Sequence, residues 1–341
     1  MKNIKTITII GDGGWGTTLA IHLAKKKYSV VLWGAFADYV AQVKESRENK
    51  KFLPGYNIPS SVQLTSDIHH AVSFGDLIVL ASPSEHLINV LKKIKGSPYK
   101  GKSFLSVIKG IHPVSFKRMS QLIKEELGPV SLAVLSGPTI AGEVASGLAT
   151  TAVIACHDMN LAKQIQKIIH SSDFRIYTND DVIGTEIGGS IKNVIAIACG
   201  ICDGMGLGTN AKAALLTRGL AEITRLGVAL GGKKETFYGL TGLGDLVTTC
   251  VSPKSRNRTV GEALGKGVKI EKILGSMSMV AEGVVTSKAV YRLSRQMKIP
   301  MPITEQVYKI IFKGKNLRKA MQDLMTRQPK PEARTRFRKI G

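Results

Sequence analysis

The sequence predicts an α/β protein: a doubly wound, mainly parallel sheet in residues 1–183, followed by a mainly α-helical domain in residues 184–328. Three observations lead to this prediction. Short apolar runs alternate with helical stretches in the first half, a glycine-rich turn follows the first run, and long amphipathic stretches dominate from about residue 181. Apolar runs of this length, separated by helices, are typical of a parallel sheet covered on both faces.

The expected elements follow in order along the chain. The strands are residues 7–10, 30–33, 77–80, 104–108, 132–135 and 151–155. The helices of the second half are residues 187–202, 211–230, 281–298 and 303–313. Residues 329–341 form a basic tail that we expect to be loosely ordered. Because doubly wound sheets bind ligands outside the carboxyl ends of their strands, the loops there should line the site.

The first apolar run leads directly into a glycine-rich turn and then a helical stretch. Gly11, Gly13 and Gly16 stand at G-x-G-x-x-G spacing. The first glycine would make the tight turn, the second would let the backbone approach a pyrophosphate, and the third would let the helix pack on the strand. The helix N-terminus then offers free N–H groups to phosphates. A Rossmann-like dinucleotide-binding domain is predicted, and a glycine-rich turn without a ligand is the alternative.

The chain is strongly basic, with 48 Lys and Arg against 25 Asp and Glu and a formal net charge of +23. The basic residues are spread along the whole chain rather than gathered in one block. This spread argues against nucleic-acid binding as a primary role. A diffuse positive field suits anionic phosphate ligands, because it accelerates their encounter with the protein.

Cysteine spacing and hydropathy predict no metal site and no membrane span. Cys199 and Cys202 form a C-x-x-C pair, but no second pair stands at zinc spacing. Two small buried residues on an apolar helix are favoured over a redox motif. No signal peptide precedes the first strand, and no uninterrupted apolar stretch approaches the roughly 18 residues that a span needs. A cytoplasmic location is therefore predicted.

Lys192 is the sharpest candidate for acid–base chemistry, since the segment around it, residues 188–196, is mainly apolar or small. A buried lysine is costly unless it is paired or neutral, which suits a general acid for a carbonyl oxygen. A lysine snorkelling at a helix edge is the alternative. Asp245 follows the glycine-rich residues 242–244. It would either orient a lysine or a substrate hydroxyl from a flexible turn, or cap the following helix.

Two further groups suit an anionic substrate. Lys109 ends a predicted strand and could hold an anionic or carbonyl-bearing substrate, with an ordinary surface lysine as the alternative. Residues 255–258 bring hydroxyl, guanidinium and amide donors together, and Arg256 suits bidentate contact with a phosphate. A solvated basic loop is the alternative for this segment.

These motifs resemble those of bacterial NAD(P)-dependent glycerol-3-phosphate dehydrogenases. The matching segments are residues 11–17, 109–111, 136–141, 188–193, 241–246, 255–258 and 280–283. Each segment alone is modest evidence, but the ordered set is highly specific. The resemblance implies a cofactor domain and a helical substrate domain with the active site between them. It also implies NADPH or NADH as the cofactor and a homodimer.

The resemblance further implies an activity and the residues that perform it. The activity is the reversible reduction of dihydroxyacetone phosphate to sn-glycerol 3-phosphate, which supplies glycerophospholipid synthesis. Lys192 would be the catalytic acid and base. The glycerol-phosphate site would comprise Lys109, Gly137, Thr139, Lys192, Asp245, Ser255, Arg256 and Asn257. The fingerprint glycines would be joined in cofactor binding by Gly14, Trp15, Lys109, Ala141, Arg256, Val280 and Glu282.

The sequence leaves the choice between NADH and NADPH open. No carboxylate stands at Gly34 or Ala35 to hold a ribose 2′-hydroxyl, and Asp38 comes late. Neither is there an Arg or His for a 2′-phosphate, since Ala35 stands where the family commonly has a basic residue, although Lys25, Lys26 and Lys27 lie nearby in the sequence. Asp12, within the fingerprint, would be mildly repulsive to a pyrophosphate unless it points to solvent.

Two rival functions have specific features against them. A related dehydrogenase acting on a sugar acid or hydroxy acid is disfavoured by Lys109 and residues 255–258, which suit a phosphate-bearing substrate. A cofactor-sensing protein without chemistry is disfavoured by the presence of both Lys192 and Asp245.

Overall fold

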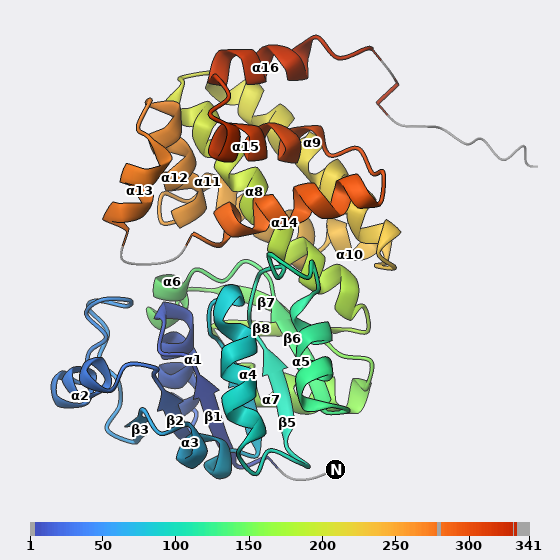
Figure 1. The fold of residues 1–341 in the computed structure, drawn as a ribbon. Helices are drawn as coiled ribbons and strands as arrows, with labels where there is room; N and C mark the ends of the chain where they lie inside the picture. The colour runs from blue at the N-terminus through green and yellow to red at the C-terminus, as the bar shows by residue number, and fades with distance from the viewer. Residues whose placement is uncertain (1–3, 278–280, 330, 333–341) are drawn as a thin grey trace, which may run out of the picture.

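The computed structural model describes residues 4–277, 281–329 and 331–332, arranged as a sheet domain and a helical domain (Figure 1). Eight strands form one sheet in the order β3-β2-β1-β4-β5-β6-β7-β8. They are β1 (Thr6–Ile10), β2 (Ser29–Trp33), β3 (Val62–Thr65), β4 (Leu77–Leu80), β5 (Ser103–Ser106), β6 (Ser131–Ser136), β7 (Thr150–Ala155) and β8 (Phe174–Asn179). All neighbours pair in parallel except β6 and β7, which are antiparallel.

Helices cover both faces of this sheet, which confirms the doubly wound α/β prediction. They are α1 (Gly14–Lys25), α2 (Ala37–Ser46), α3 (Ile68–Phe74), α4 (Leu87–Lys95), α5 (Met119–Leu127), α6 (Ala141–Ala145) and α7 (Met159–Ile169), with a short 3₁₀ turn η1 (Ser84–His86). Successive strand residues point to opposite faces. Ile9 therefore packs in the core beneath α1 and α7, whereas Ile10 packs in the core beneath α3, α4 and α5.

All six predicted strands are present, but two further strands, β3 and β8, lie outside the predicted set. Both are edge strands of the sheet. An edge strand is covered less completely, so its sequence mixes polar with apolar residues. In β8 (FRIYTN) Phe174 and Ile176 are buried while Arg175 and Tyr177 are exposed. The predicted strand 104–108 ends earlier, at Ser106, so that Lys109 lies in the loop beyond it.

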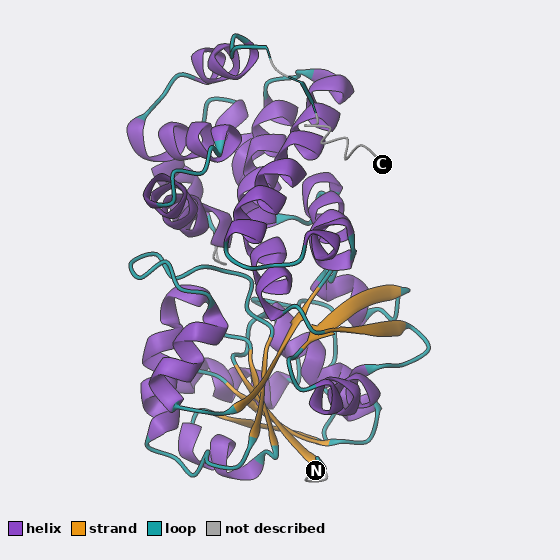
Figure 2. Cartoon of the chain, turned by 90° about the vertical axis from the view of Figure 1, so that its right-hand side faces the viewer, coloured by secondary structure: helices purple, strands orange, loops and turns teal. Residues whose placement is uncertain are grey.

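The second half of the described chain is helical, as predicted. Its elements are α8 (Val182–Gly204), α9 (Gly208–Ala229), α10 (Lys234–Tyr238), the π-helical turn η2 (Leu240–Gly244), α11 (Asp245–Val251), α12 (Arg256–Gly265), α13 (Ile270–Ser276), α14 (Glu282–Gln296), α15 (Pro302–Lys313) and α16 (Leu317–Met325). Figure 2 shows this all-helical domain stacked on the sheet domain. The predicted division at residue 183 falls within the first turn of α8 and stays a prediction.

Helix α8 runs through the centre of the helical domain and is buried along nearly its whole length. It is the one described helix long and apolar enough to cross a membrane, and 94% of its apolar window is buried inside the protein. A buried core helix meets the same criteria of length and composition, so these two properties of α8 are weak evidence for a membrane span. Close approach to α12 depends on glycine, since a Cβ on Gly200 would lie 2.0 Å from the Arg258 carbonyl oxygen.

The four cysteines are unpaired and buried, as predicted for Cys199 and Cys202. Most of the basic tail, residue 330 and residues 333–341, lies outside the described residues. The prediction that this tail is loosely ordered therefore stays a prediction.

Candidate active site

The carboxyl ends of the parallel strands face the helical domain (Figure 1), and several predicted site residues lie in the loops that follow these strands. The loops after β1, β5 and β6 supply the fingerprint, Lys109 and Gly137. Helix α8, which extends from the sheet domain into the helical domain, supplies Lys192. This is the edge at which doubly wound sheets bind their ligands.

The fingerprint glycines each meet the requirement expected of them. Gly11 has a φ of +123°, a conformation that favours glycine, and a Cβ on Gly16 would lie 1.9 Å from the Gly11 carbonyl oxygen. A Cβ on Gly13 would meet nothing within 4 Å. The backbone at Gly13 is thus open to a ligand, while Gly16 is required by the packing of α1.

Residues beside this turn also fit a bound dinucleotide. Trp15 has an indole Nε1 that is buried and has no hydrogen-bond partner in the described part of the chain. Ala141 begins α6 beside α1, because its carbonyl oxygen accepts a hydrogen bond of 3.1 Å from the Thr18 hydroxyl. A Cβ on Gly14 would lie 3.9 Å from the Ala141 Cβ. The two predicted cofactor residues Gly14 and Ala141 therefore lie side by side.

Asp245 links two lysines that are far apart in the sequence. The Lys192 ammonium donates to Asp245 Oδ1 at 2.5 Å, and the Lys109 ammonium donates to Asp245 Oδ2 at 2.9 Å. The carboxylate is 1% exposed and the Lys192 side chain 7% exposed. Because Lys192 is buried and paired, the alternative of a snorkelling lysine is wrong.

Burial lowers the pKa of Lys192 to about 8, while the Asp245 carboxylate acts in the opposite direction and Lys109 lowers it further. A lysine with this pKa exchanges its proton readily near neutral pH, as a general acid and base must. Its position is also held by the Thr249 hydroxyl, which accepts a hydrogen bond of 2.7 Å from the same ammonium.

Two glycines on α8 let this helix approach the sheet domain. A Cβ on Gly188 would lie 2.5 Å from the Thr241 carbonyl oxygen, and one on Gly189 would lie 2.4 Å from the Ser136 hydroxyl. Larger residues would push α8 away from the η2 turn and the end of β6. The glycine pair therefore allows Lys192 to reach the same carboxylate as Lys109.

Lys109 also contacts the predicted substrate residues on the loop after β6. Its ammonium donates to the Gly137 carbonyl oxygen at 2.7 Å and to the Thr139 hydroxyl at 3.2 Å. Gly137 has a φ of +136°. The structure thus brings Lys109, Gly137, Thr139, Lys192 and Asp245 together in one cluster, and Lys109 is not an isolated surface lysine.

One prediction and two alternatives about local structure are wrong. The glycine-rich residues before Asp245 form the helical turn η2 rather than a flexible turn, and α11 continues directly from it. Asp245 does not cap that helix, because its carboxylate accepts from the two lysines. Residues 255–258 do not form a loop either, although Arg256 is exposed: Ser255 is the N-cap of α12, and its hydroxyl accepts from the Arg258 amide. Tertiary contacts decide the case of Asp245, whereas a local N-cap hydrogen bond decides the case of Ser255.

The N-terminus of α12 lies against the helix that carries Lys192. The Asn257 amide donates to the Asn193 side-chain oxygen at 2.9 Å, and the Asn257 side-chain oxygen accepts from the Gly283 amide at 2.9 Å. These bonds join α8, α12 and α14. The first turn of α12, at Arg256 and Asn257, presents N–H groups that no intrahelical carbonyl can pair.

Glu282 lies at the boundary between the domains. Its carboxylate accepts hydrogen bonds from the backbone amide of Ser84, at 2.9 Å, and from the Ser84 hydroxyl. Burial raises the pKa of Glu282, and the charge of Arg256 opposes this rise. Arg256 is therefore near enough to Glu282 for its charge to act on this carboxylate. Val280, the other predicted cofactor residue of this segment, lies outside the described residues.

Sequence reasoning missed several residues that hold the site together. Thr249 lies four residues after Asp245 on α11 and therefore on the same face of the helix. That spacing could have indicated that Thr249 lies near the Asp245 carboxylate. Ser84 carried no signal in the sequence. The same is true of Glu186, which is buried on α8 and accepts from the Ser120 amide at 2.8 Å and from Arg118. These contacts join segments far apart in the chain.

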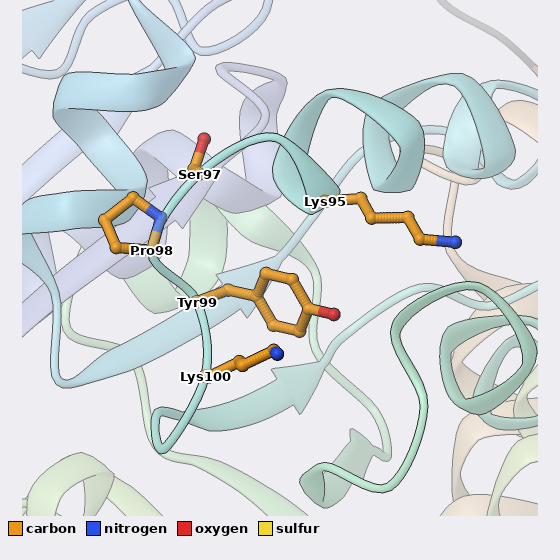
Figure 3. Close-up of a pocket in the computed structure, with 5 residues that line it drawn as sticks. All are labelled: Lys95, Ser97, Pro98, Tyr99 and Lys100. Atoms are coloured by element: carbon orange, nitrogen blue, oxygen red, sulfur yellow. The ribbon is translucent and has the colours of Figure 1, made fainter.

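A surface hollow of about 510 Å³ lies elsewhere, between Lys95 and Lys100 (Figure 3). This segment precedes β5 and therefore lies at the amino end of that strand, away from the fingerprint. Its Tyr99 hydroxyl is used internally, donating to the Leu127 carbonyl oxygen at 3.0 Å. The hollow is thus separate from the candidate active site.

Comparison with known proteins agrees with this geometry. Family models for the N-terminal and C-terminal parts of NAD-dependent glycerol-3-phosphate dehydrogenase match residues 6–162 and 181–322. A Chlorobium limicola protein named glycerol-3-phosphate dehydrogenase (NAD(P)+) is 47% identical over 329 residues, covering 96% of this chain and 99% of the relative. The chain belongs to the NAD-dependent glycerol-3-phosphate dehydrogenase family. A relative of the same name from Prosthecochloris aestuarii is 48% identical over 329 residues, 96% of this chain and 99% of its own.

The family fold is also found in solved structures. The crystal structure of glycerol-3-phosphate dehydrogenase from Coxiella burnetii is 38% identical and has a TM-score of 0.92. The match covers 94% of this chain and 99% of that one. Family membership and the nearly complete coverage confirm an NAD(P)-binding oxidoreductase with a Rossmann-type domain followed by a helical domain.

Proposed function

We propose that this protein catalyses the reversible NAD(P)H-dependent reduction of dihydroxyacetone phosphate to sn-glycerol 3-phosphate. The observation that carries the proposal is the Asp245 carboxylate, which holds Lys192 and Lys109 together at the carboxyl edge of the sheet. The same edge carries the open backbone at Gly13, where a dinucleotide would lie. Relatives at 47–48% identity carry the name of this activity.

In this proposal Lys192 transfers the proton. When bound, the reduced nicotinamide supplies a hydride to the C2 carbon of the substrate. Lys192 gives its proton to the C2 oxygen as negative charge develops there, so the carbonyl becomes an alcohol and the lysine becomes neutral. In the reverse direction neutral Lys192 takes the hydroxyl proton. Asp245 orients the ammonium, and the pKa of about 8 lets both forms of the lysine exist near neutral pH.

Lys109 would orient the substrate and Arg256 would hold its phosphate. Lys109 is fixed by Gly137, Thr139 and Asp245, so its charge is placed before the substrate arrives. The Arg256 guanidinium, together with the N-terminus of α12, suits an anion with several acceptor oxygens. Binding energy from the phosphate, which does not react, can position the carbonyl for reaction.

A turnover assay with matched substrates tests this function. We expect the purified protein to oxidise a reduced nicotinamide cofactor with dihydroxyacetone phosphate and to use dihydroxyacetone far more slowly, because the latter lacks the phosphate. Faster turnover of a 2-oxo acid would support a hydroxy-acid dehydrogenase instead. Cofactor binding without turnover of any of these substrates would support a sensing protein.

The metabolic role of the product follows from the same proposal. The product would supply glycerophospholipid synthesis. The homodimer remains a prediction from the family resemblance, and the cytoplasmic location remains a prediction from the sequence. Sedimentation of the purified protein would test the first of them.

A further inference from the structure

The end of β2 lacks the acidic side chain that commonly holds an adenosine ribose, but a carboxylate from another segment lies there. In dinucleotide-binding domains that acidic residue stands about 20 residues after the fingerprint. In this chain the position is taken by Gly34, which follows Trp33 at the end of β2. The next residues, Ala35, Phe36 and Ala37, carry no charge.

Asp12, from the fingerprint loop, fills this space. A Cβ on Gly34 would lie only 2.3 Å from Asp12 Oδ2 and 2.7 Å from Asp12 Cγ. The Asp12 carboxylate therefore lies directly against the Gly34 backbone, where the side chain of residue 34 would begin. Only glycine at position 34 leaves room for it. The pairing of Ile10 with Trp33 brings the two strand ends together.

The loop that carries Asp12 is held in place from several sides. The Asp12 carbonyl oxygen accepts hydrogen bonds from the Asn49 side chain at 2.6 Å and from the Thr17 hydroxyl at 3.2 Å. Asn49 is fully buried and is itself fixed by the Tyr39 hydroxyl, at 2.7 Å. The position of Asp12 is thus built into the fold. Burial raises the pKa of the Asp12 carboxyl, and a backbone hydrogen bond and the charge of Lys51 oppose this rise.

We propose that Asp12 supplies from the fingerprint loop the carboxylate that reads the adenosine ribose, and that it makes the protein selective for NADH over NADPH. A carboxylate at this position accepts hydrogen bonds from the ribose 2′-hydroxyl. It repels a 2′-phosphate, because both groups are negative and the site is partly shielded from water. Asp12 is then a specificity-determining residue. The inference rests on the proposed use of a nicotinamide cofactor, but not on the identity of the reduced substrate.

The test measures binding rather than turnover. Isothermal titration calorimetry of the purified protein would compare NADH with NADPH, and ADP-ribose with its 2′-phosphorylated form. We expect the unsubstituted protein to bind the forms without the 2′-phosphate at least about tenfold more tightly, where tenfold corresponds to about 1.4 kcal/mol. The Asp12→Asn variant should bind NADPH and 2′-phosphorylated ADP-ribose about tenfold more tightly than the unsubstituted protein does. Its affinities for NADH and ADP-ribose should change by less than about threefold.

Two controls separate this role from others. Asp38→Asn removes an exposed carboxylate of the neighbouring helix α2 and should leave all four affinities unchanged. ADP, which has a pyrophosphate but no ribose 2′-phosphate, tests whether Asp12 acts on the pyrophosphate instead. Equal tightening of ADP and NADPH in Asp12→Asn would overturn the proposal.

Equal or tighter binding of the 2′-phosphorylated ligands by the unsubstituted protein would also overturn it, whether or not the variant folds. That result would assign the 2′-phosphate to a cation such as Lys51, which neighbours Asp12. Thermal unfolding of each variant shows that it is folded. Failure to reduce dihydroxyacetone phosphate would leave these affinities unaffected, so the two proposals fail separately.

Discussion

Lys192 donates a hydrogen bond of 2.5 Å to Asp245, although the two residues stand on different helices and 53 positions apart in the chain. Both side chains are almost completely buried. A buried ammonium without a counter-charge would lose its proton, so the pair keeps Lys192 able to carry one. The second oxygen of the same carboxylate holds Lys109, so a single aspartate fixes two cations at the carboxyl edge of the sheet.

Replacement of Lys192 by alanine should abolish most turnover but not cofactor binding. Loss of a general acid costs about 10²- to 10⁴-fold in kcat. The fingerprint residues are untouched, so the Kd of the cofactor should change little. Steady-state kinetics and titration of the cofactor measure the two effects. Lys266→Ala removes a lysine that is 61% exposed and should behave like the parent protein. A kcat for Lys192→Ala within fivefold of the parent would rule out the assigned role.

The pH dependence should have opposite signs in the two directions. Reduction needs protonated Lys192, so its kcat should fall as the pH rises through about 8. Oxidation of glycerol 3-phosphate needs the neutral lysine and should become faster over the same range. Because the Asp245 carboxylate raises the pKa of Lys192, Asp245→Asn should move both profiles to lower pH. Profiles of kcat for both proteins measure this shift, and an unchanged midpoint would show that another group titrates.

Arg256→Lys should raise the KM for dihydroxyacetone phosphate strongly. A lysine cannot reproduce the planar donor fork, and loss of a charged hydrogen bond costs about 1.5–3 kcal/mol, or roughly 10- to 150-fold. The KM for dihydroxyacetone, which has no phosphate, should hardly change. Arg292→Lys on the exposed face of α14 is the matched control. An equal change in the KM of both substrates would show that Arg256 does not bind the phosphate.

Two alanine substitutions in the fingerprint should separate ligand binding from folding. Gly13→Ala places a Cβ where nothing lies within 4 Å, so the melting temperature should stay near that of the parent while cofactor affinity falls. In Gly16→Ala the Cβ would lie 1.9 Å from a carbonyl oxygen, so this variant should be less stable. Thermal unfolding and cofactor titration of both variants make the comparison. Loss of stability in Gly13→Ala would mean that the loop itself needs this glycine.

Glu222 should make stability depend on pH. It is buried on α9 and accepts hydrogen bonds from the amides of Ile303 and Thr304 at the start of α15. Burial raises its pKa to about 7, against 4.5 for an exposed glutamate. Between these values the folded protein binds more protons than the unfolded chain, so the contribution of Glu222 to stability falls as the pH rises from 4.5 to 7.

Melting temperatures of the parent and of Glu222→Gln across this range test the prediction. The parent should lose more stability than the variant as the pH rises, because glutamine does not titrate. Glu271→Gln, at an exposed position on α13, should retain the dependence of the parent. Parallel curves for the parent and Glu222→Gln would show that other groups control the pH dependence.

The local sequence was sufficient to predict the central strands, the longer helices of the second half and the cofactor turn. Residues 7–10 are apolar and run into glycines at the required spacing, and both features act within one strand–turn–helix unit. The central strands were predictable because burial on both faces demands continuous apolar runs. The edge strands β3 and β8 were not, since partial exposure admits polar residues.

By itself, the sequence determined the α/β order of the elements and the fingerprint. It also singled out Lys192 as a candidate acid and base, because this lysine stands in an apolar segment. Tertiary structure alone decided its partner, because the contact with Asp245 joins segments 53 residues apart and depends on how closely α8 can approach the η2 turn. It also decided that Asp12 lies over Gly34 rather than pointing to solvent. Burial, charge pairing and the distance between side chains arise only when separate segments pack together, so no local pattern contains them.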